Sequence, residues 1–103
     1  MNERGIMMRN QNYAYPLESH WSISEMDTVI AFWRAVEDAY ETGVSRQTVL
    51  SRYQAFKAVV PSKMEEKQLG RQFARVSGYE PYPVLQQARE SQAKFIKMVG
   101  DEK

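Results

Sequence analysis

The chain of 103 residues contains no cysteine and a single histidine, His20. Without cysteine there is no disulfide framework, no thiolate metal site and no thiol nucleophile, and a reducing compartment is favoured. One histidine leaves carboxylates as the abundant metal ligands, and the Glu-x-x-His pairs of di-iron bundles are absent because Leu17 stands three residues before His20. The calcium-loop and phosphate-loop patterns are missing too. We therefore expect no metal and no cofactor.

Long apolar runs are also absent. The longest, such as residues 29–33, fall far short of the roughly 20 residues that a membrane span requires. The polar amino terminus lacks the apolar segment of a secretory signal peptide. We expect a protein that neither crosses a membrane nor is exported, and together with the missing cysteines this predicts a cytoplasmic location.

Apolar content, in contrast, is sufficient for a folded domain. Hydrophobic residues make up 43% of the chain and aromatic residues 12%, which is typical of a packed globule. The length fits one domain. Residues 1–12 are polar and lack periodicity, so we predict a disordered tail there and a single helical domain over residues 13–100. Met7 and Met8 are alternative starts of translation.

An aromatic segment precedes the first predicted helix. Residues 13–21 contain Tyr13, Tyr15 and Trp21, and Pro16 favours extended backbone at the residue before it. Large aromatic side chains are mostly buried. We expect this segment to pack across the helices.

Apolar residues recur at steps of three and four after Ser22, and the spacing of Ser22 and Glu25 fits a capping box. The first helix is therefore predicted to begin at Ser22, with Ser24 as an alternative cap, and to end before Gly43. Ser45 caps the second predicted helix. The short connection requires the two helices to turn sharply against each other.

Pro61 ends the second helix because it lacks an amide hydrogen and disfavours helical geometry at the preceding residue. Ser62 and Glu65 have the spacing of another capping box. The third helix is predicted over residues 62–77, with Gly78 as its left-handed terminator. Its predicted inward stripe comprises Leu69, Phe73 and Val76.

An aromatic connector follows at residues 79–83, and Pro83 suits the first turn of a fourth helix that ends near Gly100. Ser91 and Gln92 interrupt its apolar face. That face comprises Val84, Leu85, Ala88, Phe95, Ile96 and Val99. We therefore predict an all-α fold, a compact bundle of about four helices with the extended aromatic segment packed across it.

Charge is unevenly distributed, although the formal net charge is only +1. Residues 21–43 carry five acids and one base, whereas residues 44–80 carry seven bases and three acids. Acidic and basic helices would attract each other within one molecule or between two copies.

Four bases at steps of four stay near one another while their row winds slowly round the third helix, and they form what we call the basic ridge. The basic ridge consists of Lys63, Lys67, Arg71 and Arg75. It could contact phosphates, a partner's acidic patch or the acidic helix of another copy. The low net charge and the absence of a binding motif make nucleic acid the weaker alternative. With the exposed parts of the connector at Tyr79 and Tyr82, the ridge is the predicted interaction surface.

A small hydrolase is a further alternative, with His20 as the base of a serine nucleophile and Glu25 or Asp27 as its orienting acid. These residues stand around a helix start, where serine and acids have an ordinary capping role. The adjacent acids Glu37 and Asp38 point about 100° apart on a helix, so they do not form a proton-sharing pair by themselves. We predict no catalytic residue.

Several short motifs resemble those of the YktA-like uncharacterised protein family 0223, small proteins of low-GC Gram-positive bacteria. They lie at residues 15–16, 21–22, 56–57, 60–63, 65–67 and 77–79. The resemblance covers about residues 13–88 and implies a helical bundle and a bacterial cytosolic protein, but it supplies no reaction. His20 stands where the family usually has an acid, and Arg71 and Arg75 match no fixed basic pattern of the family.

These observations together predict a non-enzymatic protein-interaction module that binds an unknown protein partner or itself. Weak binding of nucleic acid or phosphate through the basic ridge is the first alternative, and the small hydrolase is the second.

Overall fold

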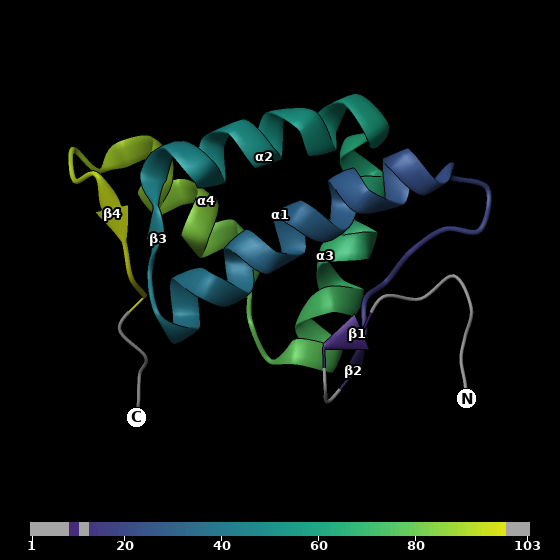
Figure 1. Cartoon of the computed structure of the whole chain (residues 1–103), viewed down its shortest axis with the longest axis horizontal. Helices are drawn as coiled ribbons and strands as arrows, with labels where there is room; N and C mark the ends of the chain where they lie inside the picture. The colour runs from purple at the N-terminus through teal and green to yellow at the C-terminus, as the bar shows by residue number, and fades with distance from the viewer. Residues whose placement is uncertain (1–8, 11–12, 99–103) are drawn as a thin grey trace.

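The computed structural model describes residues 9–10 and 13–98, and over these residues it has the predicted all-α architecture with two very short sheets (Figure 1). The four helices are α1 (Ile23–Glu41), α2 (Arg46–Val59), α3 (Lys63–Ser77) and α4 (Pro81–Glu90). β1 (Arg9–Asn10) pairs antiparallel with β2 (Tyr13–Ala14), and β3 (Val44–Ser45) pairs antiparallel with β4 (Phe95–Ile96). Most of the predicted tail, residues 1–8 and 11–12, lies outside the described residues.

Helix α1 is the central element of the bundle. The predicted capping box is present: Glu25 donates its backbone N–H to the Ser22 hydroxyl at 3.1 Å, and Ser22 donates its backbone N–H to the Glu25 carboxylate at 2.9 Å. The apolar stripe after it is buried over most of the helix and packs chiefly against α2, which runs beside α1 in Figure 1. None of the helices in the described part is long and apolar enough to cross a membrane.

The corners between the helices follow the predicted signals. Gly43 has a φ of 100° and Gly78 a φ of 83°, a backbone region that glycine occupies at little cost. Ser45 and Ser62 each accept a backbone N–H at the start of a helix, but the Glu65 side chain makes no return hydrogen bond to Ser62, so the predicted capping box there is only half formed. Helix α2 ends at Val59, two residues before Pro61. The proline therefore separates α2 from α3 as predicted.

The predicted end of the fourth helix is wrong, because α4 stops at Glu90 rather than near Gly100. Ser91 has an extended backbone, and its hydroxyl accepts the backbone N–H of Ala93 at 2.9 Å. The chain therefore turns at the two polar residues that interrupt the predicted apolar face. β4 then pairs with β3, and Met98 donates its backbone N–H to the carbonyl of Ala39 at 2.8 Å.

Two residues assigned to inward faces are also exposed. Val76 is 43% exposed, although it lies on α3 only three residues after the buried Phe73. Phe95 is 58% exposed because strand alternation turns Ile96 inward and Phe95 outward, where its ring lies against Gly43. A side chain at Gly43 would collide with that ring.

Aromatic rings form the centre of the core. Trp33 of α1 stacks on Phe73 of α3, with ring centroids 4.6 Å apart. Phe73 in turn stacks on Tyr15 at 6.5 Å, and Trp33 contacts Phe56 of α2 edge-on at 5.5 Å. Tyr15 and Trp21 are buried. The aromatic segment before α1 therefore packs across the helices, as expected.

Candidate interaction groove between α3 and α4

All four residues of the basic ridge are exposed along α3, but only three of them line a groove. Lys63, Lys67 and Arg71 line a groove of about 600 Å³ between α3 and α4, whereas Arg75 does not line it. Helices α3 and α4 make little contact with each other, and the groove lies between them. We call it the α3–α4 groove.

The opposite wall comes from α4 and the floor from the aromatic core. Pro81, Leu85 and Arg89 follow one another at steps of four along α4 and line the groove, together with Tyr82. The floor consists of Phe32, Trp33 and Phe56, which are all buried. The groove thus has charged and aromatic side chains at its rim and apolar side chains beneath.

The two walls run in opposite directions. At one end the backbone of Gly70 approaches the Pro81 ring. At the other end Tyr53 donates its hydroxyl to Glu66 at 2.8 Å, while the Arg89 guanidinium lies 5.4 Å from the centre of the Tyr53 ring. Each wall spans eight residue steps of helix, so the groove is about 12 Å long.

Glu66, an acid in the lining, already has partners within the protein. It accepts hydrogen bonds from Lys57 and Tyr53, both at 2.8 Å, and Lys63 lies 3.7 Å away. Burial by itself would raise the pKa of Glu66, but these hydrogen bonds and the two lysine charges hold it below its ordinary value. Burial and the Glu66 carboxylate raise the pKa of Tyr53 to about 12.

Lys67 and Arg71, in contrast, form neither an ion pair nor a hydrogen bond with any residue in the described part of the chain. Arg89 likewise has no acidic partner there, although its guanidinium lies over Tyr53. The charges of Lys67 and Arg71 on one wall are therefore left for water or for a ligand, whereas Arg89 on the opposite wall interacts with the Tyr53 side chain. Acceptor groups of an anion would satisfy the charges of Lys67 and Arg71.

The predicted connector residues also fall in different places. Tyr79 stacks on Tyr40 with ring centroids 4.7 Å apart and donates its hydroxyl to Glu41 at 2.8 Å. Tyr82 lines the groove and is 61% exposed. The groove therefore contains Lys63, Lys67, Arg71 and Tyr82 of the predicted surface, and Arg75 and Tyr79 lie outside its lining.

Sequence reasoning missed the α4 side of the groove. Arg89 and Leu85 lie at steps of four from Pro81, the same spacing that identified the basic ridge, so a search for this spacing would have found them. Gly70 is unfavourable in the interior of a helix, but its position in the groove is a property of the tertiary structure.

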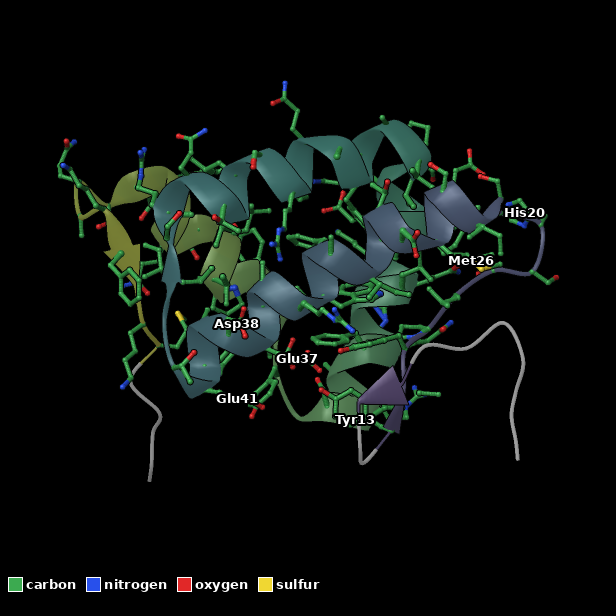
Figure 2. All side chains as sticks on the ribbon, viewed as in Figure 1. Tyr13, His20, Met26, Glu37, Asp38 and Glu41 are labelled. Atoms are coloured by element: carbon green, nitrogen blue, oxygen red, sulfur yellow. The ribbon has the colours of Figure 1, made fainter. Side chains whose placement is uncertain are left out.

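The hydrolase alternative receives no support from the geometry around His20. His20 is exposed before α1, and its ring centroid lies 6.0 Å from that of Trp21. Among the described residues no hydrogen bond links His20 to a serine or an acid. Figure 2 places it at the opposite end of α1 from Asp38 and Glu41. No cluster of three metal-ligating side chains occurs in the described residues either.

The chain is similar to bacterial proteins of one family over most of its length. A family model described as "Uncharacterised protein family (UPF0223)" matches residues 12–97, a range that includes all four helices and the groove. A UPF0223 protein of Streptococcus gordonii is 47% identical over 89 residues, which cover 86% of this chain and 97% of the relative. UPF0223 proteins of Lactococcus lactis subsp. cremoris (48% over 86 residues; 84% and 92% covered) and Streptococcus pneumoniae (51% over 81 residues; 79% and 88% covered) are similar as well.

Proposed function

The chain belongs to the uncharacterised protein family UPF0223, and we propose that it is a non-enzymatic cytosolic module that binds an acidic segment of a partner protein in the α3–α4 groove. Membership confirms the resemblance seen in the sequence motifs. It assigns no reaction, since the family is uncharacterised. The proposal therefore depends on the groove itself.

One observation carries the proposal: Lys67, Arg71 and Arg89 line one groove and have no acidic partner among the described residues. The lining carries four bases, Lys63, Lys67, Arg71 and Arg89, against two acids, Glu66 and Glu80, so it is net positive. Opposed bases on two walls raise the potential between them and attract acidic groups. A partner with two or three carboxylates would complement this arrangement.

The size and rim of the groove favour a short peptide segment. A length of about 12 Å holds about four residues of an extended chain. Tyr82 is an exposed aromatic side chain at the rim, and tyrosine and arginine are enriched where proteins bind one another. The same groove thus offers charge for acids and apolar surface for a side chain between them.

Nucleic acid remains the weaker alternative because Glu66 and Glu80 also line the groove. A continuous phosphate backbone would approach both acids, whereas a short peptide places its charges selectively. Titration with labelled RNA and DNA at two salt concentrations distinguishes the two, since phosphate binding falls steeply as salt rises.

The proposal is tested by panning a library of random 12-residue peptides on the immobilised protein. We expect enrichment of acidic peptides that bind at least tenfold more weakly to Arg71→Glu than to Arg75→Glu. Arg75 is the matched control because it belongs to the same ridge but lies outside the groove. Enriched peptides without acids, or equal binding to both variants, would contradict the proposal. A concentration-dependent dimer that loses its self-association in Arg71→Glu alone would identify the partner as a second copy.

A further inference from the structure

We infer that the acidic segment carries one large apolar side chain and that this side chain enters a niche over Gly70, so that the partner's pattern is acid, apolar, acid. The inference rests on the proposed function of the α3–α4 groove. It follows from a comparison of the three glycines among the described residues, Gly43, Gly70 and Gly78.

Two of these glycines are explained by the fold. Gly43 has a left-handed φ, and a side chain there would collide with Phe95. Gly78 has a left-handed φ and ends α3 by donating its backbone N–H to the carbonyl of Ala74 at 2.8 Å. Both positions therefore favour glycine for structural reasons.

Gly70 has no such reason. It lies in the middle of α3, and its φ is not positive. A Cβ atom at this position would meet Pro81 Cγ at 3.8 Å, an ordinary contact, and no other neighbouring atom within 4 Å. Glycine weakens a helix interior relative to alanine. What the missing side chain does provide is an open stretch of helix backbone inside the groove.

The surroundings of this opening define the expected occupant. Pro81, Tyr82 and Leu85 of α4 line the groove across from Gly70 and present apolar surface. On α3, Lys67 lies three residues before Gly70 and Arg71 one residue after it. An apolar side chain of the partner in the niche would therefore have a cation on each side. Acidic residues before and after that side chain in the partner would reach these two cations.

The inference is tested with two capped pentapeptides, each with four glutamates around a central residue that is phenylalanine in one and alanine in the other. Their binding to the isotope-labelled protein is followed by nuclear magnetic resonance. We expect the phenylalanine peptide to bind about 10- to 100-fold more tightly, the gain from burying an aromatic side chain. Its largest shifts should fall on the amides of Gly70 and Leu85.

Filling the niche gives the complementary test. Gly70→Leu should weaken the phenylalanine peptide about tenfold or more and leave the alanine peptide unchanged, while its melting temperature rises by a few degrees. Gln72→Leu adds the same side chain to an exposed position of α3 outside the groove and should change neither peptide. If Gly70→Leu fails to fold, Gly70→Ala should weaken the phenylalanine peptide by a smaller factor.

The results distinguish a failure of the inferred niche from a failure of the proposed binding function. If both peptides bind equally well and both depend on Arg71, the groove is the binding site for acidic segments, but the inferred niche over Gly70 is wrong. If neither peptide shifts any groove resonance at millimolar concentration, the niche and the proposed function are both wrong.

Discussion

Two polar clusters adjoin the aromatic core, and they differ in whether their charged groups have partners. On one side, Glu37 of α1 is only 5% exposed and accepts hydrogen bonds from the hydroxyls of Tyr13 and Tyr15, the latter at 2.8 Å. Figure 2 shows Tyr13 and Glu37 on the same side of α1. On the other side, Lys67 and Arg71 of the α3–α4 groove have no acidic partner in the described part.

The difference separates residues that stabilise the fold from residues that are free to bind. A buried carboxylate is costly unless donors compensate it, so Glu37 and its tyrosines form a unit in which each member needs the others. Exposed cations are solvated by water and cost the fold little. Changes in the Glu37 cluster should therefore lower stability, and changes in the groove should alter binding.

The largest effect is expected at Phe73, whose ring contacts both Trp33 and Tyr15. Phe73→Ala should lower the free energy of unfolding by about 4 kcal/mol, because it leaves a cavity at the centre of the core. Val76→Ala, one turn later at an exposed position of α3, should change it by about 0.5 kcal/mol or less. Urea denaturation measures both, and similar losses in the two variants would contradict the assigned core.

Glu37→Ala should lower the free energy of unfolding by about 3 kcal/mol, since it leaves two tyrosine hydroxyls without their acceptor. Asp38→Ala is the neighbouring control at an exposed position. Peptide binding in the groove should persist at temperatures where the variant is folded. A variant as stable as the control would show that the cluster does not stabilise the fold.

Alkaline pH should weaken the tyrosine contacts on both sides of the core. Burial, followed by the adjacent carboxylate, raises the pKa of Tyr15 and of Tyr53 to about 12, from 10.0 for an unperturbed tyrosine. The folded state thus favours the protonated phenols, and their contribution to stability is complete below pH 10 and is lost between pH 10 and 12. Urea midpoints across this range should fall less steeply in Tyr15→Phe than in the unchanged protein. Equal slopes would refute the assignment.

Local signals predicted the helices because caps and breakers act within a few residues. Ser22, Pro61 and Gly78 each mark a helix boundary that the structure confirms. The pairing of β3 with β4 had no such signal, since each strand has two residues and the strands are far apart in the chain. The predicted fourth helix therefore continued through residues that instead form a turn and a strand.

The sequence predicted the α3 wall of the groove but not its α4 wall. Spacing on a single helix identified the bases of α3, but whether Arg71 or Arg75 faces a groove depends on where α4 lies. The opposing position of Arg89 and the opening at Gly70 arise only when the two helices come together. A single sequence does not specify that arrangement.

The smallest effect on stability is expected at Arg71 and Arg75. The same two residues provide the most direct test of whether the α3–α4 groove binds an acidic segment. Charge reversal at either exposed position should change the free energy of unfolding by about 0.5 kcal/mol or less. The decisive measurement is the dissociation constant of a library-selected acidic peptide for Arg71→Glu and Arg75→Glu side by side. We predict about tenfold or greater weakening for Arg71→Glu and a much smaller change for Arg75→Glu. Equal dissociation constants for the two variants would show that the groove is not the binding site.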